Sequence, residues 1–576
     1  MGTKGSSRFT PVIIAISVVA GILIGTFYAK HYGGNKLGII NGSSNKLNAL
    51  LHVIDDQYVD TVDMSQLVES AMPQILAELD PHSTYIPAQK LEEVNSELEG
   101  SFSGVGIQFT IQEDTIHVNS VVSGGPAEKV GLMAGDRIVT VDDSLFVGKD
   151  LTNEKAMRTL KGPKGSQVKL GVKRITEKEL LDFVVTRSDI PQNTIDAAYM
   201  ISNDFGYVQI SKFGRTTHVE LLNAIAQLSH QNCKGMIIDL RENTGGYMEA
   251  AIRMVNEFLP EGKLIVYTQG RKYPRMEEYA NGTGSCQNIP LVVLIDQGSA
   301  SASEIFAGAI QDNDRGTIVG LRSFGKGLVQ QPIDFSDGSA IRLTIARYYT
   351  PSGRCIQRPY ENGKDSKYEM DWLDRYEHGE FFSADSVKLD KKLRYSTSLG
   401  RPVYGGGGIM PDVFVPRDTT GVTSYLMEVS NKGLLIQFSF QYTDRNRAKL
   451  DQFNDETELQ KYLEKQNIVE QFVQFAAQKG VKRRNLLINK SRKLLERNLY
   501  GNIIYNIQGK EAYIRYINRD DATVLKALEI LERGEAFPKA PTTIKEEKND
   551  NREKRTAQVY SRIEDPAHNF HYAFIG

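Results

Sequence analysis

The sequence predicts a mixed α/β protein with an inserted β-rich segment, an N-terminal membrane-spanning helix and a mainly helical C-terminal region. Three observations lead to this prediction. Between residues 197 and 418, short apolar runs alternate with helical segments, which is the pattern of an α/β core. Residues 100–188 carry closely spaced strand-like runs separated by turn residues, and residues 420–536 carry apolar stripes at helical spacing.

The composition excludes several classes of function. The chain has 576 residues, too many for one ordinary domain, and its 69 basic residues nearly balance its 71 acidic ones. That balance gives no support for nucleic-acid binding. The three cysteines, Cys233, Cys286 and Cys355, are too widely spaced to indicate a metal site or a disulfide framework. No phosphate loop or dinucleotide fingerprint is apparent, so we expect no metal, no cofactor and no nucleic-acid partner.

Residues 1–33 have the layout of a membrane anchor. Residues 11–29 form an uncharged, mostly apolar run that is about long enough to cross a bilayer. Lys4 and Arg8 precede the run, and no small-residue cleavage site follows it. We therefore expect an uncleaved, single-pass anchor in the cell membrane, with the bulk of the chain outside the cytoplasm (in the periplasm of a Gram-negative cell). The alternative is a buried helix.

Residues 45–99 and 100–188 have different periodicities. Apolar residues at spacings of three and four predict helices in the first segment, with a turn at residues 80–85. In the second segment a helix is predicted at residues 153–160 and alternating runs predict a small β-rich domain. The predicted strands are 105–111, 116–121, 137–141, 167–172 and 181–186.

The remainder of the chain is predicted to form an α/β core (197–418), a helical region (420–536) and a tail (537–576). Buried strands are predicted at residues 236–240 and 291–295, and helices at 247–258 and 302–311. In the C-terminal region, Ile468, Phe472, Phe475 and Ala476 form one apolar stripe, and Val524, Leu528 and Leu531 form another. We interpret both stripes as core packing. Residues 537–576 are rich in charge and are expected to be a solvated tail.

Residues 297–304, Gln-Gly-Ser-Ala-Ser-Ala-Ser-Glu, are the most informative segment for chemistry. They follow an apolar strand and open a helix, where free N–H groups and the helix dipole favour developing negative charge. A nucleophilic serine needs such a place, because its reaction produces an oxyanion. The alternative is that Ser299 or Ser301 only caps the helix.

The candidate base for such a serine is Lys326. Histidine is the usual base, but none occurs between His230 and His378. Lys326 lies between two glycines before a predicted strand, and burial would favour the neutral amine that a base requires. Gln330 is suited to orient that amine without adding charge. The alternative is a solvated lysine in a turn.

A second turn supplies candidate oxyanion donors. Residues 241–246, Arg-Glu-Asn-Thr-Gly-Gly, also follow a buried strand. Glycines there allow the backbone to approach a substrate carbonyl closely. The N–H of Gly245 or Gly246 could therefore complete an oxyanion hole with that of Ala302.

Together these segments resemble the C-terminal processing peptidases, the S41 serine proteases. The resemblance covers residues 45–415 and rests on motifs in the family's order: LDPHSTY (79–85), DLRENTGG (239–246), GSASASEIFAGA (298–309), SFGKGLVQQ (323–331), RYYTPSGRCIQ (347–357) and GGGIMPDV (406–413). It implies a crotonase-like protease core, with Ser301 as the nucleophile, Lys326 as the base and Gln330 as its support.

The β-rich segment resembles a PDZ domain. Residues 103–109, Ser-Gly-Val-Gly-Ile-Gln-Phe, are similar to the carboxylate-binding loop of such domains. The implied contacts with a substrate C-terminus are Gly104, Val105, Gly106, Ile107 and Phe109. Backbone N–H groups of the loop would hold the carboxylate, and Ile107 and Phe109 would line an apolar pocket. The alternative is a PDZ fold without a peptide-binding role.

The resemblance thus implies a membrane-anchored serine endopeptidase that acts on proteins or peptides with free C-termini. A catalytically silent PDZ scaffold or chaperone is the alternative. A third reading is another acyl-transfer enzyme on a crotonase-like core, which the PDZ segment and the absence of a cofactor motif disfavour. The substrate, a homo-oligomeric state, an accessory adaptor, and whether the PDZ domain activates or inhibits all stay open.

Overall fold

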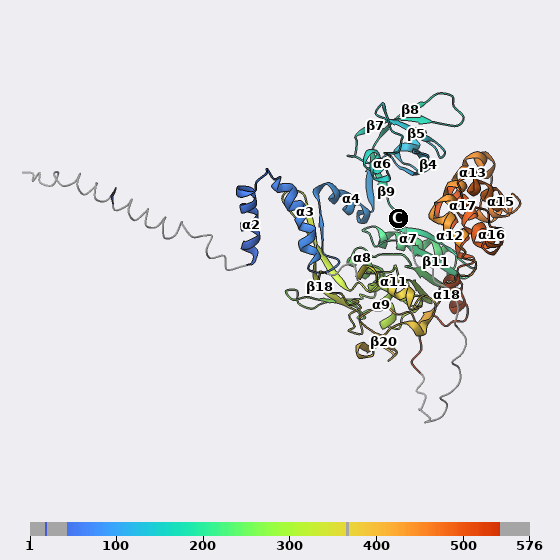
Figure 1. Cartoon of the computed structure of the whole chain (residues 1–576). Helices are drawn as coiled ribbons and strands as arrows, with labels where there is room; N and C mark the ends of the chain where they lie inside the picture. Colours follow the sequence, from blue (N-terminus) through green and yellow to red (C-terminus); the bar gives the residue numbers. More distant parts are fainter. Residues whose placement is uncertain (1–17, 20–42, 364–367, 542–576) are drawn as a thin grey trace, which may run out of the picture. The chain divides into compact units, whose positions relative to one another are not determined.

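The structure is a computed structural model that describes residues 18–19, 43–363 and 368–541 (Figure 1). Apart from Val18 and Val19, the predicted membrane span lies outside these residues, as does the chain from 542 onward. Within the described ranges, no helix is both long and apolar enough to cross a bilayer.

The chain divides into two compact units, residues 1–79 and 80–576. The described part of the first unit consists of α2 (Ser43–Gln57) and α3 (Met64–Ala77), as the apolar spacing predicts. Asp63 starts α3 by accepting a hydrogen bond from the Gln66 N–H at 3.0 Å, which satisfies one of the free donors of the first turn.

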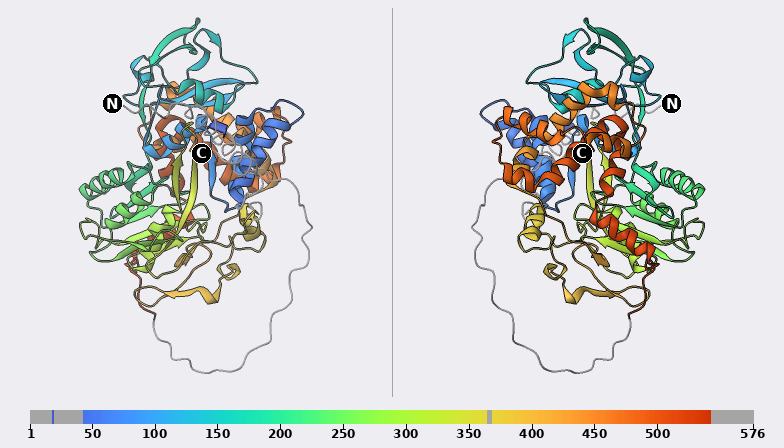
Figure 2. Two further views of the ribbon diagram at one scale, coloured as in Figure 1. Left: turned by 90° about the vertical axis from the view of Figure 1, so that its left-hand side faces the viewer. Right: turned by 90° about the vertical axis from the view of Figure 1, so that its right-hand side faces the viewer.

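The second unit contains the predicted β-rich domain, whose cyan strands form a body of their own in both views of Figure 2. Its antiparallel sheet has the order β3-β4-β5-β7-β8, and β6 (Ser144–Leu145) pairs with β5. The main strands are β3 (Ile107–Gln112), β4 (Thr115–Val121), β5 (Arg137–Val141), β7 (Gln167–Lys173) and β8 (Leu181–Thr186). The helix α6 (Asn153–Leu160) adds Ala156 and Leu160 to the core. A separate ribbon of β2 (Ser101–Gly104) and β9 (Ser188–Pro191) leads into and out of the domain.

The centre of the second unit is a six-stranded sheet with the order β10-β11-β12-β15-β16-β21. Only the pair β10–β11 is antiparallel, so this is the parallel sheet expected of an α/β core. The strands are β10 (Ile195–Met200), β11 (Phe205–Ile210), β12 (Gly235–Asp239), β15 (Leu291–Ile295), β16 (Thr317–Gly320) and β21 (Val413–Phe414).

Alternate residues of these strands enter two different cores, because successive side chains point to opposite faces of a sheet. Ile238 and Val293 pack with α7 (Thr217–His230), α8 (Met248–Asn256) and α9 (Ala302–Asp312) on one face. On the other face, Val292 and Leu294 pack against α18 (Ala522–Glu532). The central sheet is therefore covered by helices on both faces.

A second sheet contains the strand that directly follows Lys326. Its order is β1-β18-β13-β14, and β17 forms a hairpin with β18. The strands are β1 (Thr84–Ile86), β13 (Leu264–Gln269), β14 (Met276–Tyr279), β17 (Leu328–Asp334) and β18 (Ala340–Tyr349). The remaining elements before residue 420 are α4 (Ala88–Glu99), α5 (Pro126–Lys129), α11 (Asp371–Glu377), β19 (Arg394–Ser396) and β20 (Pro402–Tyr404), with short 3-10 turns at Ala384–Ser386 and Lys391–Leu393.

The C-terminal region is helical, as predicted. It contains α12 (Ser424–Asn431), α13 (Leu434–Leu450), α14 (Glu456–Leu463), α15 (Ile468–Gln478), α16 (Asn485–Lys490), α17 (Arg492–Asn518) and α18. The predicted apolar stripe of α15 belongs to a separate hydrophobic core that the helices α12–α17 form together. Gly509, at φ 84°, breaks α17 in two, and the second half contacts β10 of the central sheet.

The helix α13 also contacts the β-rich domain. The Arg137 guanidinium of β5 forms an ion pair with Asp444 at 2.6 Å. Beside it, the rings of His117 and Phe440 meet edge to face, with centroids 5.1 Å apart. The C-terminal region therefore contacts both the β-rich domain and the central sheet.

Candidate active site

Ser301 lies where β15 ends and α9 begins. Its backbone adopts φ 55° and ψ −112°, a conformation that costs energy for any residue other than glycine. Ser301 is half-buried, whereas every residue of α9 after it is buried. The strained turn therefore presents one serine at the positive end of a helix dipole.

The two neighbouring serines have structural partners instead. Ser299 Oγ donates to the carbonyl oxygen of Leu240 at 2.7 Å, and Ser303 Oγ donates to the carbonyl oxygen of Asn243 at 2.8 Å. Both side chains are fully buried. They tie the serine turn to residues 240–243, which leaves Ser301 as the accessible hydroxyl of the run.

Lys326 is largely buried in the loop before β17. Its Nζ donates to Gln330 Oε1 at 3.1 Å. Burial lowers the pKa of the Lys326 amine below its usual value and the charge of Arg342 lowers it further, although Glu304 and Asp80 act in the opposite direction. In the part of the chain that the structure describes, no hydrogen bond joins Lys326 Nζ to Ser301 Oγ.

The turn at residues 80–85 holds Gln330 in place. Gln330 Nε2 donates to the carbonyl oxygen of His82. Asp80 stabilises this turn, because it accepts bonds from the His82 and Ser83 N–H groups and from the Thr344 hydroxyl of β18. Gln330 is therefore fixed between the lysine and a distant segment of the chain.

The same turn brings a histidine to the site that the sequence reasoning missed. His82 Nε2 lies 2.9 Å from the Tyr368 hydroxyl. Burial, and after it the positive charge of Lys326, lower the pKa of His82 to about 4. The ring is thus neutral near pH 7 and adds no charge beside the lysine.

Glu304 is the second residue that the sequence reasoning missed. Its fully buried carboxylate accepts from the Ser301 N–H at 2.9 Å and the Lys326 N–H at 2.8 Å. It also accepts from the Gly325 N–H at 2.7 Å and the Ser323 hydroxyl at 2.5 Å. Burial raises the pKa of the Glu304 carboxyl, and these donors oppose the rise.

Glu304 therefore joins the turn at Ser301 directly to the loop that contains Lys326. Tyr348 reinforces the link, since its hydroxyl lies 3.1 Å from the carbonyl oxygen of Ser301 and 2.8 Å from that of Lys326. The available sequence signal was the Ser-x-x-Glu spacing of Ser301 and Glu304, the pattern of a helix capping box.

We expect Glu304→Gln to impair both activity and folding. In the glutamine variant, the NH₂ group of the side-chain amide would face N–H groups that now donate to a carboxylate oxygen of Glu304. Hydrogen bonds to a charged group contribute ~1.5–3 kcal/mol each, so we expect a loss of about 2–4 kcal/mol in the free energy of unfolding. Urea denaturation and peptide cleavage rates measure the two effects. The control is Glu249→Gln, which disrupts an exposed pair with Arg253 and should change neither quantity appreciably.

Of the candidate oxyanion donors, Gly245 lies beside Ala302 at the start of α9. The Ala302 N–H belongs to the first helical turn, which lacks intrahelical acceptors. Gly245 and Gly246 adopt φ 106° and φ 144°. A Cβ at Gly245 would lie 2.8 Å from the Ser301 Cβ, so only glycine fits there. Of the two predicted glycine donors, Gly245 already uses its N–H to donate to Asn243 Oδ1 at 2.9 Å, so Gly246 remains the candidate.

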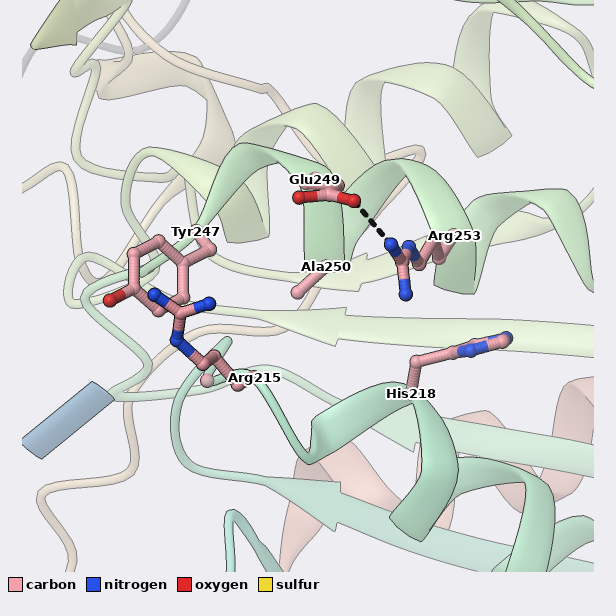
Figure 3. A pocket seen from close by; sticks show the side chains of 7 residues that line it. Arg215, His218, Tyr247, Glu249, Ala250 and Arg253 are labelled. Carbon is pink, nitrogen blue, oxygen red and sulfur yellow. Dashed lines mark hydrogen bonds and ion pairs between the residues drawn. The ribbon is translucent and has the colours of Figure 1, made fainter. Parts of the chain in front are cut away.

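A cavity of about 250 Å³ opens beside this turn (Figure 3). The Arg215 guanidinium lies over the Tyr247 ring at 5.5 Å and pairs with Glu99, while Arg253 pairs with Glu249. The lining residues are Gly214, Arg215, His218, Tyr247, Glu249, Ala250 and Arg253. None of the candidate catalytic residues lines it, so we assign it no catalytic role. Among the described residues, no cluster of His, Cys, Asp or Glu side chains is arranged to hold a metal ion.

Comparison with known proteins gives three family matches along the chain. Residues 204–363 match peptidase family S41, residues 103–185 match the PDZ domain, and residues 425–509 match a family of unknown function. The carboxy-terminal-processing protease of Bartonella bacilliformis is 38% identical over 306 residues, which is 52% of this chain and 69% of that protein. The chain belongs to the S41 carboxy-terminal processing proteases.

A second relative agrees. The carboxy-terminal processing protease CtpB of Bacillus subtilis is 31% identical over 61% of this chain and 71% of that protein. Among solved structures, the photosystem II D1 C-terminal processing protease matches 55% of this chain and 90% of that chain, with 29% identity and a TM-score of 0.31. The S41 proteases are serine peptidases, so this chain is a serine peptidase with a PDZ domain.

In this S41 protease, the five predicted peptide contacts lie in the PDZ domain along β2, the following loop and β3. Within the described residues β3 pairs only with β4, so its other edge is unpaired. Gly106 has φ 81°, and its carbonyl oxygen accepts from the Val122 N–H. Ile107 and Phe109 pack against the domain core and are partly exposed. Val105 is 3% exposed, so its side chain belongs to the core, and Gly104 is paired with Ser188.

Proposed function

We propose that this S41 protease is an endopeptidase that hydrolyses peptide bonds through an acyl-enzyme, with Ser301 as nucleophile and Lys326 as general base. The neutral Lys326 amine takes the hydroxyl proton while Ser301 Oγ bonds to the substrate carbonyl carbon. The resulting oxyanion is stabilised by the N–H groups of Ala302 and Gly246. The lysine then donates its proton to the leaving amine, and a water molecule hydrolyses the ester by the same route.

One observation carries this proposal: the Lys326 amine is buried and hydrogen-bonded to a neutral amide rather than to a carboxylate. Both conditions favour the neutral form, which is the form a base requires. The proposal also requires that Ser301 Oγ comes within about 2.6–3.2 Å of Lys326 Nζ during the reaction. Mass spectrometry of casein digested by the wild type and by Ser301→Ala tests it, because new peptide termini should form only with the wild type.

We further propose that the PDZ domain selects substrates by a free C-terminal carboxylate. The unpaired edge of β3 supports this, because an extended peptide can pair with such an edge. The turn at Gly106 lies directly before that strand, where N–H groups can hold a carboxylate in a charge-assisted contact.

A peptide ending in small apolar residues should therefore be cleaved faster than its C-terminally amidated twin. We expect a difference of about tenfold or more in kcat/KM, because hydrogen bonds to a charged group contribute ~1.5–3 kcal/mol each. Deleting residues 100–188 should erase the difference, whether the basal rate rises because the domain blocks the site or falls because it activates it. Equal rates for the acid and the amide in the intact protein would refute carboxylate selection.

Finally, we propose that residues 11–29 anchor the protease in the cell membrane as a single span, with the catalytic part outside the cytoplasm. The proposal rests on their apolar composition and the preceding basic residues Lys4 and Arg8. A protein starting near Asn35 should remain in the supernatant after ultracentrifugation and keep its peptidase activity, whereas the full chain should sediment with membranes. Full-length protein in the supernatant would contradict the anchor.

A further inference from the structure

The last helix of the C-terminal region is part of the protease core. Val524 and Leu531 of α18 are 0% and 3% exposed, and they pack against Ile237, Val292 and Leu294 of the central sheet. Residues 425–509, which match a family of unknown function, separate α18 from the last strand of that sheet. The chain therefore returns to the core after forming the helical bundle, where α18 contacts β12, β15 and β16 of the central sheet.

Asp521, at the start of α18, has two sets of partners. Its carboxylate caps the helix by accepting from the N–H groups of Thr523 and Val524, each at 3.0 Å. Both carboxylate oxygens also accept from Arg241 Nη1, again at 3.0 Å. Neither side chain is freely solvated, since 21% of Asp521 and 19% of Arg241 is exposed.

Arg241 is the first residue of the turn that carries the candidate oxyanion donor. On its other side, the guanidinium binds Asp239 through Nε at 3.0 Å and Nη2 at 2.6 Å. Asp239 is fully buried at the end of β12 and accepts from the Tyr207 hydroxyl at 2.6 Å. Arg241 is therefore held between a carboxylate of the core and a carboxylate of α18.

Two residues after Arg241, this turn contacts the neighbours of the nucleophile. The Asn243 carbonyl oxygen accepts from the Ala300 N–H at 3.0 Å and from the Ser303 hydroxyl at 2.8 Å. Its side chain holds the Gly245 N–H. A displacement of Arg241 would thus move the backbone that faces Ser301.

We propose that Asp521 is a positioning residue for catalysis. Through Arg241, Asp521 holds the turn at residues 241–246 against the nucleophile. The helix α18 of the C-terminal region therefore contributes to the protease site. This inference rests on the proposed function, because it concerns the same oxyanion donors. It assigns a role to a segment outside the matched S41 region, residues 204–363.

Asp521→Asn tests the inference, because asparagine caps a helix about as well as aspartate but carries no charge for Arg241. We expect kcat for a short peptide to fall about tenfold or more with little change in KM, as for an interaction that stabilises only the transition state. The matched control is Asp455→Asn. Asp455 caps α14 in the same way, through the N–H groups of Thr457 and Glu458, and its substitution should leave kcat unchanged.

A second comparison separates positioning from a general loss of folding. If Asp521 acts through Arg241, then Asp521→Asn should lower kcat little further in an Arg241→Lys background. An undiminished kcat in Asp521→Asn, or the same fold-loss in both backgrounds, would overturn the inference. If Ser301→Ala is inactive in the same assay, the proposed function stands whatever Asp521→Asn shows, so the two failures are distinguishable.

Discussion

Ser301→Ala is expected to abolish peptide cleavage while leaving the fold intact. Loss of the nucleophile of a serine peptidase lowers kcat by roughly 10⁴-fold or more. The side chain is half-buried at the start of α9, so its removal should change the free energy of unfolding by at most about 1 kcal/mol. Peptide turnover and thermal unfolding of the purified variant measure the two quantities.

The neighbouring serines provide matched controls within the same run. Ser299→Ala and Ser303→Ala would each leave a buried carbonyl oxygen, of Leu240 or Asn243, without its hydroxyl partner. Each carbonyl oxygen keeps a backbone donor, the Asn243 N–H or the Ala300 N–H, so the lost hydrogen bond costs ~0.5–1.5 kcal/mol. We therefore expect slightly lower stability and substantial remaining activity. If Ser299→Ala or Ser303→Ala were inactive and Ser301→Ala active, the assignment of the nucleophile would be wrong.

Replacing Lys326 is expected to be equally severe. Lys326→Met keeps a similar length without a base, and Lys326→Arg introduces a guanidinium that stays protonated and accepts no proton. Both variants should therefore be inactive over the whole pH range in which the protein is folded. Substantial turnover by Lys326→Arg would rule out the Ser–Lys dyad.

The pH dependence of the wild type should have a defined sign. The reactive form is the neutral amine, so kcat/KM should rise with pH and level off above the pKa of Lys326, which burial places below its usual value. Gln330→Glu would put a negative charge 3.1 Å from the amine and stabilise the ammonium, so the rise should move to higher pH. Gln330→Ala should lower the rate less than Lys326→Met does. A flat pH profile would contradict a lysine base.

Much of the local structure follows from the sequence. The strand predicted at residues 137–141 is observed as predicted, and the helix at 153–160 likewise. The strand predicted at residues 105–111 begins two residues too early, because β3 begins at Ile107 after the turn at Gly106. Alternating and helical apolar spacings are local signals, which explains why they predict elements well and their exact ends less well.

The sequence by itself determined the positions of Ser301 and Lys326, because a strand-to-helix turn and a glycine-flanked loop can be read from neighbouring residues. Only the tertiary structure showed that Glu304 joins these turns, that His82 supports Gln330 and that Asp521 holds Arg241. The partners of His82 and Asp521 lie in distant segments of the chain, and chain folding alone brings them together. The sequence also does not distinguish a buried glutamate such as Glu304 from a solvated one, because the two differ only in burial and in their hydrogen-bond donors.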